Sequence, residues 1–122
     1  MLIEPINTVD MPGLHLCGTA QALAILDEVG TTTPSLRSTT HHLQRMEGEL
    51  AASLQKQLAR IGHGQLADNP GRNEPGTGTG TGTGKVNYGF VLAHLDRIGH
   101  AGWVGRQHKP APHPRHRPAR TP

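Results

Sequence analysis

The residues of this chain that could do chemistry are mainly histidines and a few isolated carboxylates. Nine histidines invite a search for a metal site. His41 and His42 are adjacent, but no second ligand pair stands at a usable spacing, so they form no zinc motif. His108, His113 and His116 are close enough to chelate weakly, but they fall in a proline-rich segment that offers no scaffold. Histidine spacing alone therefore predicts no metal site.

A glycine-rich segment, 76–85, ends in Gly-Lys and faintly resembles a phosphate-binding loop. In such loops the lysine is followed by Ser or Thr, whereas Val86 follows Lys85 here. Residues 77–84 are Thr-Gly four times over, with no side chains to pack. The segment is therefore interpreted as a short sequence expansion in a loop and not as a nucleotide site.

The elements that must position any site alternate between strand-like and helix-like patterns. Short apolar runs bounded by turn residues predict strands, and apolar stripes recurring every three to four residues predict helices. The expected strands are 2–6, 36–43, 61–67 and 103–108, and the expected helices are 20–29, 47–60 and 88–98. This alternation implies parallel β/α units, arranged either as half of an eight-stranded barrel or as a small open sheet.

Turn and capping residues mark the limits of these elements. The hydroxyl of Thr19 is expected to cap the first helix, and Gly30 and Gly99 are expected to end the first and third. The strand 36–43 is the weakest, because almost all its side chains are polar. The segment 68–84 is expected to be a loop.

Several stretches of the sequence together resemble the motifs of a known family. They are Leu2-Ile-Glu-Pro-Ile-Asn-Thr8, Gln44-Arg-Met-Glu-Gly-Glu-Leu-Ala51, the run from Gly62 to Gly78, Val86-Asn-Tyr88 and Gly102-Trp-Val-Gly105. In order, and nearly in spacing, they resemble the hydroxypyruvate isomerases, a branch of the xylose isomerase-like barrels. The resemblance covers roughly the first 110 residues. It implies strands five to eight of the family's barrel, without strands one to four.

The resemblance implies an architecture and a reaction. The expected fold is α/β, a partial (β/α)8 TIM barrel with three helices over 1–109, followed by a disordered, basic, proline-rich tail over 110–122. The family interconverts hydroxypyruvate and tartronate semialdehyde, an aldose-ketose type isomerisation of glyoxylate metabolism performed by an intramolecular oxidoreductase. A base removes a proton beside a carbonyl, an acid returns it on the neighbouring carbon, and a divalent cation stabilises the enediolate. The implied partner is a small 2-oxo or 2-hydroxy acid.

Four site positions of the family are retained. Glu4 matches the first glutamate, a metal ligand that also serves as acid/base. Gln65 matches a metal-ligand position on the seventh strand. His42 and Arg72 match positions that contact polar groups of the substrate. The resemblance therefore places the expected site at the carboxyl ends of the strands.

Two further positions depart from the family pattern. Thr39 stands where the family has an aspartate ligand, and Gln107 stands where it has the second glutamate, a ligand and acid/base. A neutral hydroxyl is a poor ligand for Mg or Mn, and an amide cannot exchange the proton. Removing one acid/base group commonly costs about 10²- to 10⁴-fold in rate. We therefore expect the metal to be lost and the chain to be a truncated remnant of the family without robust catalysis.

Two alternatives stay open. The chain could be half of a split isomerase, completed by another chain that supplies strands one to four. It could instead be a noncatalytic binding module that uses its basic tail. The tail carries four positive charges without interleaved aromatic residues, so nucleic acid is not the expected partner.

Composition narrows the class of protein. The formal charge of +3 comes from the tail, because residues 1–108 carry eight basic and nine acidic side chains. One cysteine, Cys17, excludes an internal disulfide framework. No apolar run approaches a membrane span, and the start lacks the basic region of a signal peptide, so a cytoplasmic protein without a membrane partner is expected. Gly and Pro together make 26 of 122 residues, which predicts a thin core.

Overall fold

The computed structural model of the chain describes residues 1–76 and 85–110. The predicted disordered tail and the Thr-Gly repeat therefore lie outside the described residues, apart from Pro110. The binding-module hypothesis, which depends on that tail, stays a prediction.

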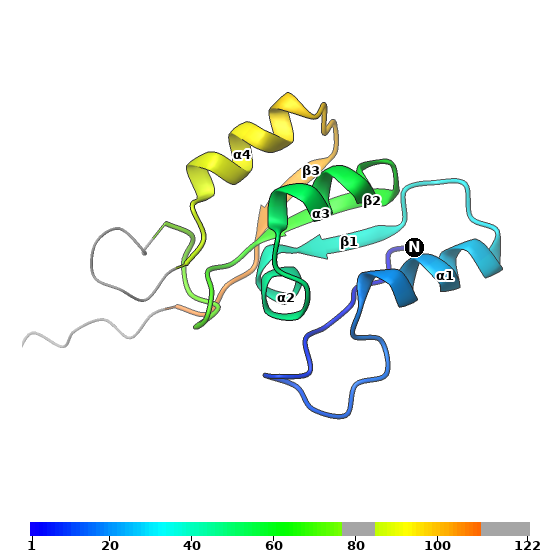
Figure 1. The fold of residues 1–122 in the computed structure, drawn as a ribbon, viewed down its shortest axis with the longest axis horizontal. Coiled ribbons are helices and arrows are strands. Elements are labelled where there is room, and N and C mark those ends of the chain that lie inside the picture. The colour runs from blue at the N-terminus through cyan, green and yellow to red at the C-terminus, as the bar shows by residue number, and fades with distance from the viewer. Residues whose placement is uncertain (77–84, 111–122) are drawn as a thin grey trace, which may run out of the picture.

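Three parallel strands form one sheet in the order β1, β2, β3, with helices in the connections (Figure 1). The elements are α1 (Thr19–Val29), β1 (Leu36–Thr39), α2 (Thr40–Met46), α3 (Leu50–Gln57), a 3₁₀ turn (Leu58–Arg60), β2 (Ile61–Leu66), α4 (Tyr88–Arg97) and β3 (Trp103–Arg106). The expected parallel β/α units are thus present.

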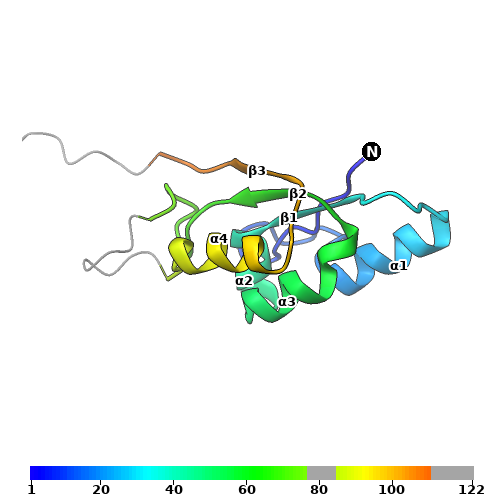
Figure 2. The same ribbon diagram turned by 90° about the horizontal axis from the view of Figure 1, so that it is seen from above.

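All four labelled helices lie on one side of the sheet (Figure 2). The core is the layer between them and the strands, and its members include Leu36, Leu54, Ile61, Val91 and Leu95. Burial of these apolar side chains is the main force that holds the layers together. The other face of the sheet is covered by no helix of the described residues, and we call it the open face.

The first predicted strand, 2–6, is much shorter than expected. Only Ile3 pairs with β1, by a parallel bridge to Leu36 in which the Ile3 amide donates to Ser35 and the Ile3 carbonyl accepts from Arg37, both at 2.9 Å. The next inward-facing amide in this ladder would belong to residue 5. Pro5 has no amide hydrogen, so the ladder ends there.

The predicted strand 36–43 and helix 47–60 also need correction. The strand stops at Thr39, and residues 40–43 open α2 with buried side chains instead. The helix begins at Leu50, because Gly48 and Glu49 adopt positive φ values of 67° and 42° in a turn. Because residues 40–42 are polar, there was no apolar pattern in the sequence from which the start of α2 could be predicted.

The cap of α1 differs from the prediction. Gly18 is its N-cap, and Thr19 is the first helical residue. The Thr19 amide donates to the Glu47 carboxylate at 2.9 Å, so a residue distant in sequence satisfies this helix end. Gly30 ends the helix with φ 74°, as predicted.

Among the described residues no helix has the length and apolar content needed to cross a membrane.

Candidate functional site

The open face carries a row of polar side chains set by the strand register. A bulge at Gly62 lets Leu36 and Ile61 face the helices, while Arg37 pairs with His63 and Thr39 with Gln65. A side chain at Gly62 would collide with the carbonyl of Pro34, so only glycine fits the bulge. Side chains two residues apart on a strand share a face. The open face of β1 therefore presents Arg37 and Thr39.

Three of the predicted site residues meet on this face. The Thr39 hydroxyl lies 2.5 Å from a Glu4 carboxylate oxygen and 3.0 Å from the Gln65 side-chain oxygen. A hydroxyl has one proton to donate, and the charged carboxylate is the stronger acceptor. Thr39 therefore donates to Glu4, and turning the Gln65 amide so that its nitrogen faces Thr39 pairs all three groups.

The Glu4 carboxylate also has a cationic neighbour. The Arg37 guanidinium lies 3.7 Å from the second Glu4 oxygen, and the Glu4 side chain is 17% exposed. Arg37 lies on the same face as Thr39, two residues earlier on β1. The negative charge of Glu4 is thus balanced by a residue of this chain.

His42 lies at the edge of this cluster and is almost completely buried. Its Nδ1 accepts the backbone amide of Asn7 at 3.2 Å and lies 2.7 Å from the Asn7 side-chain nitrogen. Burial, together with the positive charge of Arg72 and the proximity of His41, lowers the pKa of His42 to about 4. The ring is neutral near pH 7, and its proton sits on Nε2, which lies 3.9 Å from Glu4 and has no hydrogen-bond partner among the described residues.

The other two predicted residues, Arg72 and Gln107, bind each other. The Arg72 guanidinium donates to the Gln107 side-chain oxygen at 2.9 Å. Arg72 has φ 57°, a left-handed backbone that few non-glycine residues adopt, and its carbonyl accepts the Lys109 amide at 2.7 Å. The loop after β2 and the segment after β3 are thereby joined. Gln107 is thus bound by Arg72, whereas Glu4 is bound by Thr39.

A second buried histidine, His41, ties the loop 7–16 to the sheet. Its Nε2 lies 2.7 Å from the Asp10 carboxylate, its Nδ1 lies 2.9 Å from the Asp68 carbonyl, and its side chain is fully buried. Burial raises the pKa of Asp10, but hydrogen bonds from His41 and Asn7 and the charge of Arg45 outweigh it, and the net pKa is lowered. This cluster positions Asn7, and through it His42.

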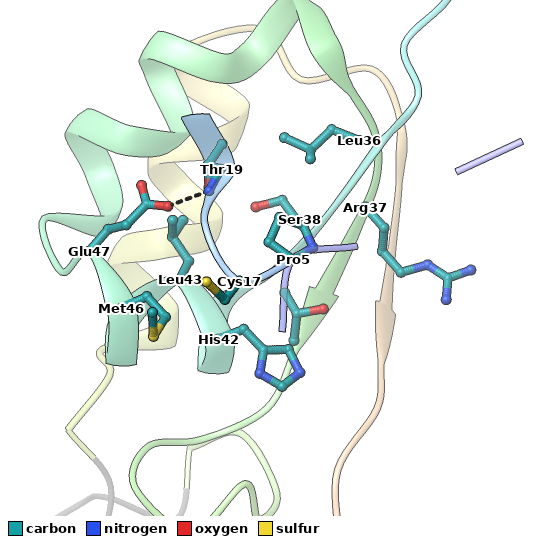
Figure 3. Close-up of a pocket in the computed structure, with 11 residues that line it drawn as sticks. Pro5, Cys17, Thr19, Leu36, Arg37, Ser38, His42, Leu43, Met46 and Glu47 are labelled. Atoms are coloured by element: carbon teal, nitrogen blue, oxygen red, sulfur yellow. Dashed lines mark hydrogen bonds between the residues drawn. The ribbon is translucent and has the colours of Figure 1, made fainter. Parts of the chain in front are cut away.

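A small pocket lies on the helix side of β1, behind the polar row. Figure 3 shows Leu36 and Ser38 pointing toward the helices and Arg37 pointing the other way, with the Glu47 cap of Thr19 closing one side. The pocket has a free volume of about 10 Å³, room for one water molecule. It is too small for an organic acid, so it adds no binding space to the polar row of the open face.

Comparison with known proteins shows which sequences this chain resembles. No family model matches the chain. A protein of Escherichia coli K12 named hydroxypyruvate isomerase is 44% identical over 110 residues, which are 90% of this chain and 40% of that protein. A 2-oxo-tetronate isomerase of Cupriavidus necator is 38% identical over the same shares. Over 90% of its length the chain is thus similar in sequence to a protein named hydroxypyruvate isomerase. It spans about 40% of the length of these relatives.

Solved structures agree on the fold. A Brucella melitensis protein described as AP endonuclease, family 2, superposes with a TM-score of 0.78 and 31% identity over 89% of this chain and 40% of that one. The Escherichia coli 3-keto-D-glucoside 4-epimerase superposes with a TM-score of 0.75 at 22% identity, over 90% and 38%, which shows likeness of fold alone. The isomerase-like chain is a partial TIM barrel of the xylose isomerase-like type, as predicted.

The donor set does not fit the divalent cation implied by the family. Mg²⁺ and Mn²⁺ prefer several charged or carbonyl oxygens. Here Glu4 is the one carboxylate of the row, Thr39 is a neutral hydroxyl that donates to it, and the Arg37 guanidinium lies beside it. Within 1–76 and 85–110, no three His, Cys, Asp or Glu residues gather in a ligand-like group. The row as it stands is therefore a poor site for Mg²⁺ or Mn²⁺.

Restoring a carboxylate beside Glu4 should make stability depend on a cation. In the Thr39→Asp variant, two carboxylates would lie side by side in a nearly buried position and repel each other. We expect destabilisation by about 2 kcal/mol in EDTA, partly reversed by millimolar Mn²⁺, which binds only the folded form. Thermal unfolding of the variant and the unaltered chain measures this. If Mn²⁺ stabilised the variant and the unaltered chain equally, the conclusion that the unaltered donor set fits a divalent cation poorly would be contradicted.

Sequence reasoning missed Arg37, His41 and Asp10. Arg37 could have been found, because it stands two residues before Thr39 on an expected strand and so shares its face. His41 and Asp10 gave no local signal, since their contact joins positions 31 apart.

Proposed function

We propose that this chain is a noncatalytic relative of the hydroxypyruvate isomerases, one that keeps part of the family's polar site without its proton-transfer pair. The observation that carries this proposal is the set of partners of Glu4. Its carboxylate accepts from Thr39 and lies beside Arg37, while the second acid/base position is Gln107, an amide engaged by Arg72.

The chemistry explains why these partners matter. Isomerisation through an enediol needs one group to remove a proton and another to return it on the neighbouring carbon. A side-chain amide has no proton to deliver at neutral pH, and in the part of the chain that the structure describes no cation-binding set stands beside Glu4 to stabilise the enediolate. The exposed Arg37 guanidinium beside Glu4 can attract the carboxylate of a small 2-oxo or 2-hydroxy acid, which would then bind without being turned over. Glyoxylate metabolism is proposed from the resemblance of the motifs to the family, and a cytoplasmic location from the composition of the sequence.

A turnover assay tests the proposal. Purified chain is mixed with hydroxypyruvate and millimolar MgCl₂ or MnCl₂, and formation of tartronate semialdehyde is followed. We expect no rate above that without protein, and no change in the Glu4→Gln variant. Saturable turnover that Glu4→Gln abolishes would overturn the proposal.

A second candidate is the split isomerase. It is favoured by one observation, that the chain spans about 40% of its relatives, which leaves room for a chain that supplies the remaining strands. It requires co-purification with such a chain. Even in that complex, Thr39 and Gln107 predict activity far below that of a variant with Asp and Glu at these positions.

A further inference from the structure

We propose that the groove between α3 and α4 is a self-association surface, in which Phe90 of one copy of this chain inserts into the groove of a second copy. This inference is independent of the proposed function, because it concerns two helices and not the open face of the sheet.

The groove is built from segments well inside the chain. α3 and α4 pack side by side (Figure 1), and the groove lies between their first turns. Its apolar lining includes Leu50 from α3, Val91 from α4 and Val86 just before α4. Val86 and Val91 are buried members of the core, and Leu50 packs against that core. Both walls are described by the structure, and neither end of the chain forms them.

The size of the groove fits an aromatic ring. Its free volume is about 220 Å³, whereas an apolar cavity of about 150 Å³ is enough to hold a benzene molecule. Phe90, the single phenylalanine of the chain, stands on the α4 wall and is 52% exposed. The same surface thus carries a space for a ring and a ring that is half in water.

The Phe90 ring is held in place by α3 and α4 together. It stacks on His94, with ring centroids 6.0 Å apart and an angle of 13° between the planes. His94 Nδ1 lies 2.6 Å from the Arg97 guanidinium, which can only donate, so His94 Nε2 carries the proton and donates to the Ala51 carbonyl of α3 at 2.9 Å. A ring fixed in this way loses little conformational entropy when it binds.

The charges at the rim indicate what fills the groove. Glu49 stands on the α3 wall and Lys85 on the α4 wall, and both are exposed. Within 1–76 and 85–110, neither side chain takes part in an ion pair. A two-fold axis along the groove exchanges the two walls, so Lys85 of each copy faces Glu49 of the other and Phe90 lies over the opposite α3 wall. The charges and the shape of the groove are therefore complementary to a second copy.

The first test is the mass of the chain in solution. Nine residues line the groove, fewer than the roughly 20–30 a side of a standard interface, so we expect a weak dimer with a Kd of about 50 µM. Sedimentation equilibrium of residues 1–122 should then give 13.0 kDa at low micromolar concentration and approach twice that mass near millimolar concentration. A 13.0 kDa species over the whole range would overturn the proposal.

A matched pair of variants on α4 locates the contact. Phe90→Ala removes the inserted ring, whereas Leu92→Ala removes an apolar side chain that is 42% exposed and does not line the groove. We expect Phe90→Ala to weaken dimerisation at least about 100-fold and Leu92→Ala to leave it unchanged. Circular dichroism checks that both variants are folded. Equal dimerisation of the two would contradict the proposed contact.

Charge reversal tests the arrangement of the two copies. Glu49→Lys alone and Lys85→Glu alone each place like charges across the interface, and each should weaken dimerisation about tenfold. In a mixture of these two variants every lysine faces a glutamate, so a heterodimer with the affinity of the unaltered chain is expected. Folded variants that associate no better in the mixture than separately would overturn the proposal.

Discussion

His41→Ala should lower the free energy of unfolding by about 3 kcal/mol, a large share of the stability of a chain with so thin a core. The ring is fully buried and joins the Asp10 carboxylate to the Asp68 carbonyl. Removing it leaves both acceptors without this partner and opens a cavity beneath the loop 7–16. Denaturant unfolding followed by circular dichroism measures the effect.

Arg45→Ala is the matched control for that experiment. Arg45 donates to the other Asp10 oxygen at 2.9 Å, and its side chain is 19% exposed, whereas that of His41 is fully buried. Ion pairs that water still reaches contribute about 0–1 kcal/mol, so this variant should lose much less stability than His41→Ala. If the two variants lose similar stability, the buried position of His41 does not have the importance assigned to it.

Stability should fall as pH decreases from about 6.5 to about 4, chiefly through His42. Burial, Arg72 and His41 lower its pKa to about 4 in the folded chain, against 6.5 when unfolded. In this interval the unfolded chain binds the proton more strongly, so the stabilisation by neutral His42 is complete above the unfolded value and is lost toward the folded value. At about 1.4 kcal/mol for each unit, the loss is of order 3 kcal/mol.

Urea unfolding at a series of pH values measures this dependence. His42→Gln should flatten the curve between pH 6.5 and 4, because it removes the titrating ring. His15→Gln, a change in an exposed loop residue, should leave the curve as it is. If the slope survived in His42→Gln but disappeared in His15→Gln, the pH dependence would come from His15 and the prediction for His42 would be wrong.

Elements with a clear apolar period were predictable from sequence. The stripe of α4, with Gly99 after it, and the short run of β2 gave nearly the observed bounds. Elements whose buried side chains are polar and are held by hydrogen bonds to distant segments were not predictable from sequence. Residues 40–43 are polar except for Leu43, and their helix is stabilised by packing and by the contacts of His41 and His42 with distant segments.

The part of the candidate site that is positioned by strand register alone was predictable from sequence. Adjacent parallel strands place Thr39 beside Gln65, and the short segment before Pro5 adds Glu4. Arg72 and Gln107 instead bind each other, because loop geometry after β2 decides where the guanidinium points. Sequence patterns carry little information about such long-range loop contacts.

Solvent deuterium incorporation tests the central claim, that this relative of the isomerases does not transfer a proton. Hydroxypyruvate is incubated in deuterated buffer with the chain and Mg²⁺ or Mn²⁺, and exchange at the carbon beside the carbonyl is followed by NMR. The account predicts exchange at the rate seen without protein, with no change in Glu4→Gln. Protein-dependent exchange that disappears in Glu4→Gln would contradict it, since Glu4 would then be working as an acid/base despite Thr39 and Arg37.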